Sequence, residues 1–103
     1  MAATLNNLAE LYRQQGKYEQ AEPLYQRSLT ITEQALGPEH PEVAITLSNL
    51  AGLCESQGKY EQAEPLYQRA LAIMERALGL DHPNTRTVRD NLERLRDRRS
   101  GEA

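Results

Sequence analysis

The sequence predicts an all-α fold: an α-solenoid of two helical hairpins and a C-terminal capping helix, five helices in all. The first observation is a repeat, because residues 15–27 return letter for letter as residues 57–69. The second is the spacing of apolar residues, which follows the i, i+3, i+4 pattern of helices in both copies. A fixed period of this size indicates stacked units, since each unit buries its apolar face only against its neighbours.

The five helices are expected at residues 3–15, 18–36, 41–57, 60–78 and 83–98. Gly16 follows the first helix and supplies the positive φ that a helix end commonly needs, and the short turn makes the second helix antiparallel. Gly37 ends the second helix, and Pro41 opens the third at its first position. The ending, residues 100–103, is expected to fray. We expect one domain, with repeat one at about 3–44, repeat two at about 45–86 and the capping helix at about 83–98.

Several residue types keep their places from one copy to the next. In the first copy they are Asn7-Leu8-Ala9, Tyr12, Gly16, Tyr18, Ala21, Tyr25 and Leu29. The second copy matches them except that Cys54 replaces the first tyrosine. These residues and their spacing resemble the tetratricopeptide repeat, in the version of about 42 residues found in kinesin light chains. The resemblance implies a right-handed helical solenoid whose concave face binds peptides. The identity between the copies is typical both of recent duplication and of deliberate consensus design.

The composition argues against several classes of function. The net charge is −3, which gives no electrostatic case for binding nucleic acid. No apolar stretch reaches the roughly 18 residues that span a membrane, and no charged-then-apolar leader opens the chain. The single cysteine, Cys54, permits no intramolecular disulfide. We therefore expect a soluble protein of a reducing, cytoplasmic compartment, with neither nucleic acid nor membrane as a partner.

No residue pattern indicates catalysis. His40 and His82 each follow an acidic residue and precede proline, but they stand one repeat apart, in equivalent loops that do not converge on one ion. The chain has no glycine-rich phosphate loop and no supported Ser/His/Asp or Cys/His pairing. We expect no enzyme activity, no cofactor and no metal.

The two ends of the solenoid are expected to differ. In the first helix, Leu8 and Leu11 lie on the face that would meet a preceding helix. In the fifth helix, the face that would meet a following helix carries Arg89, Glu93 and Arg96, which is typical of a solvating cap. The apolar strip of Leu8 and Leu11 indicates either self-association with a second copy or truncation of a longer array.

The outward faces of the first, third and fifth helices are expected to line the concave groove. Their residues are Asn6, Asn7, Glu10, Arg13, Gln14, Ser48, Asn49, Gly52, Glu55, Ser56, Asp90, Asn91, Arg94 and Arg98. Asn7, Asn49 and Asn91 recur one repeat apart, and an asparagine can both donate to and accept from a peptide backbone. In some members of the family that the chain resembles, such asparagines and Lys or Arg clamp a C-terminal carboxylate. Here Asn6 and Asn91 stand at the basic positions, so the clamp is incomplete and does not imply acidic-tailed ligands.

The sequence predicts a protein-interaction scaffold that binds a peptide or protein partner in its groove. The alternative is a structural module that assembles as a homodimer or an array through its apolar N-terminal edge. Two hairpins and a cap make a short groove, so weak intrinsic affinity for peptides is expected.

Overall fold

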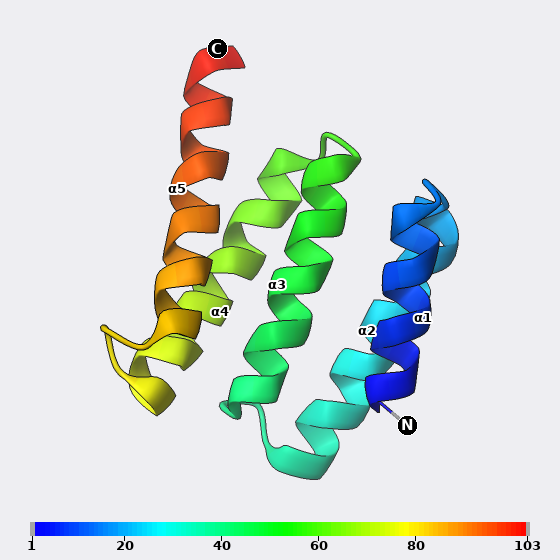
Figure 1. Ribbon diagram of the computed structural model, residues 1–103, viewed down its shortest axis with the longest axis horizontal. Helices are drawn as coiled ribbons and strands as arrows, with labels where there is room; N and C mark the ends of the chain where they lie inside the picture. Colours follow the sequence, from blue (N-terminus) through cyan, green and yellow to red (C-terminus); the bar gives the residue numbers. More distant parts are fainter. Residues whose placement is uncertain (1, 103) are drawn as a thin grey trace.

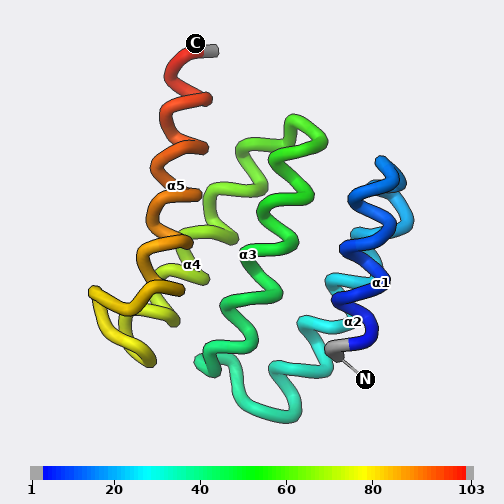
Figure 2. The backbone as a smooth tube through the Cα atoms, in the orientation of Figure 1, coloured from blue at the N-terminus to red at the C-terminus, as the bar shows by residue number. Residues whose placement is uncertain are grey.

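The computed structural model describes residues 2–102, with side chains over residues 4–101, and these residues form five α-helices and no strand. The helices are α1 (Ala2–Gln14), α2 (Tyr18–Leu36), α3 (Pro41–Ser56), α4 (Tyr60–Leu78) and α5 (Pro83–Glu102). In Figure 1, α1, α3 and α5 form one layer, and α2 and α4 lie behind them in a second layer. The tube in Figure 2 follows the antiparallel path from one hairpin to the next, with α1 and α5 at opposite sides of the molecule. The predicted all-α solenoid of two hairpins and a terminal helix is confirmed.

The ends of the helices follow the residues that predicted them. The bounds of α2 and α4 agree with the prediction, and α1 and α3 end one residue earlier. Gly16 has φ 77° and Gly37 has φ 93°, which glycine adopts without the steric cost that a Cβ brings. At the start of α3, the Nδ1 atom of His40 accepts a hydrogen bond from the backbone N–H of Glu42 at 3.1 Å. His40 therefore caps a helix, and Pro41 needs no hydrogen-bond partner at this position.

Helix α5 is longer than predicted. The expected end at residue 98 and the expected fraying of residues 100–102 are wrong, since the helix continues to Glu102; Ala103 lies outside the described residues. The physical reason is an anchor near the end of the helix. Arg99 donates to the carboxylate of Glu64 on α4, so the last turns of α5 are tied to the hairpin beneath them.

The core lies between the two layers and between successive repeats. Leu50 (6% exposed) and Leu53 (0%) of α3 share a buried cluster with Ala21 and Tyr25 of α2. One repeat later, Leu92 and Leu95 of α5 are buried in a cluster with residues of α4. The same face of α3 and of α5 therefore packs on the second helix of the repeat before it.

In α1 this face has no cover within the described chain. Leu8 is 39% exposed and Leu11 is 49% exposed. On the opposite edge, Glu93 and Arg96 of α5 are exposed, and no helix packs over them in the described chain. Arg89, the third residue predicted for this charged face, is only half-exposed, and its Nη2 donates to the backbone carbonyl of Leu80 at 3.0 Å.

Candidate functional site

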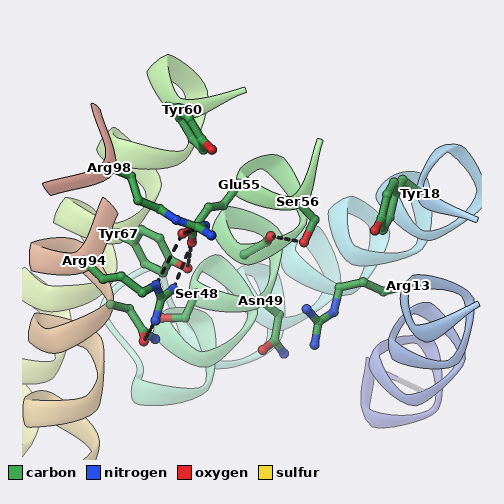
Figure 3. Close-up of a pocket in the computed structure, with 12 residues that line it drawn as sticks. Arg13, Tyr18, Ser48, Asn49, Glu55, Ser56, Tyr60, Tyr67, Arg94 and Arg98 are labelled. Atoms are coloured by element: carbon green, nitrogen blue, oxygen red, sulfur yellow. Dashed lines mark hydrogen bonds and ion pairs between the residues drawn. The ribbon is translucent and has the colours of Figure 1, made fainter. Parts of the chain in front are cut away.

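A pocket of about 620 Å³ opens on the face formed by α1, α3 and α5. It is lined by Arg13, Tyr18, Ser48, Asn49, Gly52, Glu55, Ser56, Tyr60, Tyr67, Asn91, Arg94 and Arg98. Figure 3 shows Arg94 and Arg98 on one side of the pocket and Arg13 on the other, with Asn49 between them. Each of the five helices contributes a lining residue, so the pocket depends on the stacking of both repeats and the cap.

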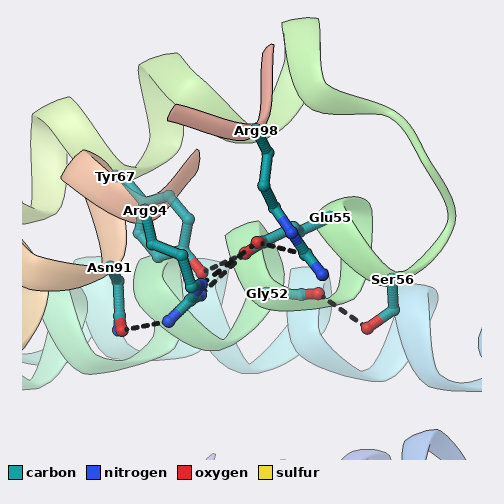
Figure 4. A network of polar contacts seen from close by, with 7 residues as sticks. All are labelled: Gly52, Glu55, Ser56, Tyr67, Asn91, Arg94 and Arg98. Atoms are coloured by element: carbon teal, nitrogen blue, oxygen red, sulfur yellow. Dashed lines mark hydrogen bonds and ion pairs between the residues drawn. The ribbon is translucent and has the colours of Figure 1, made fainter. Parts of the chain in front are cut away.

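Glu55 is the buried centre of a charge network beside the pocket. It is only 6% exposed, yet its carboxylate accepts hydrogen bonds from three side chains of other helices. Tyr67 Oη donates to Oε1 at 3.1 Å, Arg94 Nη2 donates to Oε1 at 2.9 Å, and Arg98 Nη1 donates to Oε2 at 2.8 Å. Figure 4 shows both guanidinium groups converging on this carboxylate. The network therefore joins α3, α4 and α5 at one point.

The network changes the acidity of its members. Burial alone would raise the pKa of Glu55, but the hydrogen bonds and charge of Arg94 and the bonds from Arg98 and Tyr67 together hold it below its ordinary value of 4.5. Burial, and then the neighbouring Glu55 carboxylate, raise the pKa of Tyr67 to about 12. At neutral pH Glu55 is therefore ionised and Tyr67 is a hydrogen-bond donor.

Repeat one contains a related network with a different layout. Tyr25 Oη donates to Glu10 Oε2 at 2.8 Å, and Arg13 pairs with the same carboxylate from one turn along α1. The hydrogen bond from Arg13 is the largest cause that lowers the pKa of Glu10. Both charged side chains are 36% exposed. The carboxylate here stands at the position that Gly52 occupies in α3, and its arginine comes from the same helix.

The pocket lining is positive although the chain is acidic. Its charged residues are three arginines and one glutamate, an excess of two positive charges, against a net charge of −3 for the whole chain. The Arg94 and Arg98 side chains are 51% and 54% exposed, so part of each guanidinium faces the solvent. Arg98 donates to Glu55 through Nη1 alone among the described residues, which leaves its other N–H groups free to bind an anion.

The structure brings some of the predicted groove residues into this pocket and places others elsewhere. Those in the lining are Arg13, Ser48, Asn49, Gly52, Glu55, Ser56, Asn91, Arg94 and Arg98. Asn6, Asn7, Glu10, Gln14 and Asp90 lie outside the lining. Asn6 Nδ2 donates to Thr46 Oγ1 at 3.2 Å and links α1 to α3, while Asn7 is exposed. Two of the three laddered asparagines, Asn49 and Asn91, therefore share the pocket.

Three tyrosines of the lining were not among the predicted groove residues. In the sequence they stand out only as residues that recur between the copies, Tyr60 as the counterpart of Tyr18 and Tyr67 as the counterpart of Tyr25, with no predicted role in the groove. A signal was present, since all three belong to the block that the two copies share. The phenol rings add flat apolar surface to a lining whose other side chains are polar or charged.

Comparison with known proteins agrees with this architecture. The family model of the tetratricopeptide repeat matches residues 1–76 and, in a second match, residues 42–103. The chain belongs to the tetratricopeptide repeat family. Proteins of this family generally mediate protein–protein interaction and are typically not enzymes.

Two solved structures show the same fold in longer chains. One is the crystal structure of BtubC (BKLC) from P. vanneervenii, with 30% identity and a TM-score of 0.83 over 91% of this chain and 37% of that one. The other is a putative kinesin light chain with nearly identical TPR-like repeats from Podosopora anserina, with 24% identity and a TM-score of 0.85 over 96% of this chain and 47% of that one. The chain thus spans less than half the length of either structure. None of the curated protein sequences compared with this chain matches it.

Among residues 2–102, no helix is long and apolar enough to cross a bilayer. The same part of the chain holds no cluster of three or more His, Cys, Asp or Glu side chains that could bind a metal ion.

Proposed function

We propose that this chain is a protein-interaction module whose pocket binds an extended peptide segment that carries carboxylate groups. The observation that supports the proposal most is the excess of guanidinium groups in the lining, from Arg13, Arg94 and Arg98, in a chain that is negative as a whole. Guanidinium groups with free N–H donors suit carboxylates, because the two groups can pair through charge-assisted hydrogen bonds.

The remaining lining suits a peptide backbone. Asn49 is partly exposed, and its amide offers both a donor and an acceptor to a chain that leaves water. Gly52 has no side chain, so a ligand can lie against the α3 backbone between the three arginines. A peptide with acidic side chains that flank a close backbone contact fits this arrangement.

The experiment is a fluorescence-anisotropy titration with labelled ten-residue peptides of matched aromatic content, one set rich in glutamate and one rich in lysine. Saturable binding is expected for the acidic set alone, weakening with salt as screened charges do. Arg98→Ala should weaken it, whereas Arg86→Ala, an exposed arginine of α5 outside the lining, should not. Equal affinity for both sets, or loss in the Arg86 variant alone, would contradict the proposal.

A second candidate function is assembly through the edge of α1. The observation that favours it is the exposure of Leu8 (39%) and Leu11 (49%), whose counterparts Leu50 and Leu53 are 6% and 0% exposed. Contiguous exposed apolar side chains at a solenoid end are typical of a contact surface. In the variant Leu8→Glu/Leu11→Glu, any assembly seen by sedimentation should be lost while peptide binding in the pocket persists. Loss of both together would mean that the edge and the pocket are not separate sites.

A further inference from the structure

The interface between the two repeats has a fixed charge polarity. Three ion pairs cross it, Glu22–Lys59 at 4.0 Å, Glu33–Arg69 at 3.2 Å and Glu39–Arg76 at 3.2 Å. In every pair the acid belongs to repeat one and the base to repeat two. The acids therefore lie on the side of repeat one that faces repeat two. The bases that pair with them lie in the second helix of repeat two or in the turn before that helix.

The same polarity continues at the other end of repeat two. Glu64 is the counterpart of Glu22 in the second copy, and it pairs with Arg96 and Arg99 of α5. The capping helix thus supplies the bases that a following repeat would supply. Repeat two thus shows the same arrangement as repeat one: acids on its C-terminal side pair with bases of the helix that packs there.

At the N-terminal edge two of the three bases are present, since the counterpart of Arg76 is Gln34, and no described acid pairs with the two that remain. Lys17 and Arg27 are the counterparts of Lys59 and Arg69, and both are exposed. Neither forms an ion pair with any described residue; the Lys17 ammonium lies only 6.0 Å from the ring centre of Tyr12. Leu8 and Leu11 lie on this edge as well, so it repeats the apolar pattern of the interface between the repeats and, at two of three positions, its basic pattern; no described residue covers it.

We propose that this N-terminal edge, made of Leu8, Leu11, Lys17 and Arg27, docks a helical hairpin whose second helix carries carboxylates spaced as in Glu22 and Glu33. Positions so spaced lie about three helical turns apart, which puts both acids on one face of the helix. The leucines supply the apolar contact, and the charges select the partner and its direction. The proposal rests on the second candidate function, assembly through this edge, and names the partner.

A second copy of the chain does not meet these requirements in either orientation. If the N-terminal edges of two copies packed together, Lys17 and Arg27 of one copy would approach those of the other. Repulsion between these like charges disfavours that dimer. The N-terminal edge of one copy cannot pack on the C-terminal end of another, because Leu92 and Leu95 of α5 already fill the place that an incoming first helix would take. The charge pattern therefore favours a distinct, acidic hairpin over self-pairing.

The test extends the full chain at its N-terminus with a duplicate of residues 1–42, which keeps the register of the repeat across the join. The added hairpin should cover the edge. The amide hydrogens of Leu8 and Leu11 in the original part should then exchange more slowly than in the parent chain, and the urea midpoint should rise.

Charge reversal tests the named chemistry. Glu22→Lys/Glu33→Lys in the added copy should remove part of the gain in urea midpoint, and Lys17→Glu/Arg27→Glu in the original copy should do the same. The two reversals combined should restore the gain, because the pairs re-form with opposite sign. Glu19→Lys in the added copy, an exposed acid that forms no ion pair within the described residues, is the control: it loses only the favourable charge of the first helical turn, and Lys17→Glu/Arg27→Glu should not restore that loss.

The outcomes separate the two proposals. If the added hairpin slows no exchange and raises no midpoint, assembly through this edge is wrong and the inference fails with it. If the edge becomes protected but reversal has no effect, or the double reversal does not restore the gain, only the acidic identity of the partner is wrong. Sedimentation of the parent chain at high micromolar concentration should give a monomer, and a dimer that Leu11→Glu splits would overturn the argument against self-pairing.

Discussion

Repeats one and two contain an identical stretch, residues 15–27 and 57–69, yet equivalent positions in the two repeats lie in different surroundings. Leu11 is half exposed and Leu53 is fully buried, although they occupy the same position in successive repeats. Tyr25 and Tyr67 both donate to a carboxylate, but Glu10 is shared with an arginine of its own helix and Glu55 with arginines of another helix. In a solenoid the energetic role of a residue is set by the neighbouring repeat as much as by its own.

The largest expected difference between the repeats concerns the two leucines. Leu53→Ala removes a side chain that is 0% exposed and should lower the free energy of unfolding by about 2–5 kcal/mol. Leu11→Ala removes one that is 49% exposed and should cost about 1 kcal/mol or less. Urea denaturation of the two variants beside the parent chain measures both losses, and equal losses would mean that α1 is covered in solution.

The two tyrosine hydroxyls should rank in the same order. Tyr67→Phe leaves the Glu55 carboxylate, whose side chain is 5% exposed, without one of its donors, at a cost of about 1.5–3 kcal/mol. Tyr25→Phe should cost about 1 kcal/mol or less, because Glu10 is 36% exposed and water can replace the lost donor. Thermal unfolding followed by circular dichroism compares them, and a larger loss in the Tyr25 variant would contradict the ranking.

Acid should affect the repeats unequally as well. The pKa of Glu55 is lower in the folded chain than its ordinary value of 4.5, so the stability that it contributes is complete above that value and is lost as the pH falls through the folded pKa. Glu55→Gln should flatten the decline in urea midpoint below about pH 4.5. Glu10→Gln, whose pKa is lowered mainly by Arg13, is the matched variant and should flatten it less, because the Glu10 pair is more exposed.

The smallest expected effect is at the position where repeat two has glycine and repeat one has Glu10. A Cβ added at Gly52 would meet only Tyr67 Oη, at the ordinary contact distance of 3.6 Å. Gly52→Ala should therefore stabilise the fold by about 0.5–1 kcal/mol, as removal of a helix-interior glycine does. Gly58→Ala is the contrasting variant, because φ 77° is strained for alanine, and it should destabilise the fold. A loss of stability in the Gly52 variant would show that its surroundings are tighter than this geometry.

Helix positions and faces were predictable because they depend on local chemistry. Gly16 and Gly37 mark the ends of helices and Pro41 marks the start of one, and few other residues suit those positions. The apolar spacing then shows which face of each helix is buried. The length of α5 was not predicted, since the ion pair between Arg99 and Glu64 that anchors its last turns joins residues 35 apart in the sequence.

The sequence predicted which helix faces line the candidate site, but not which of its side chains bond to one another. The helical wheel placed Glu55, Arg94 and Arg98 on the groove side as separate ligand contacts. Arg94 and Arg98 reach Glu55 across 39 and 43 residues, and only the packed distance between α3 and α5 decides that these long side chains meet. A helical wheel predicts the direction in which each Cβ points. It does not predict which side chain of another helix a long, flexible arginine will contact.

Cys54 lies in α3 at 4% exposure, within the cluster that includes Tyr67 and Leu95, and burial raises the pKa of its thiol. A thiol that is both shielded and protonated reacts with alkylating reagents only when the surrounding helices separate. Because Cys54 is the one sulfhydryl in the sequence, the rate at which an alkylating reagent modifies the chain measures how often repeat two opens.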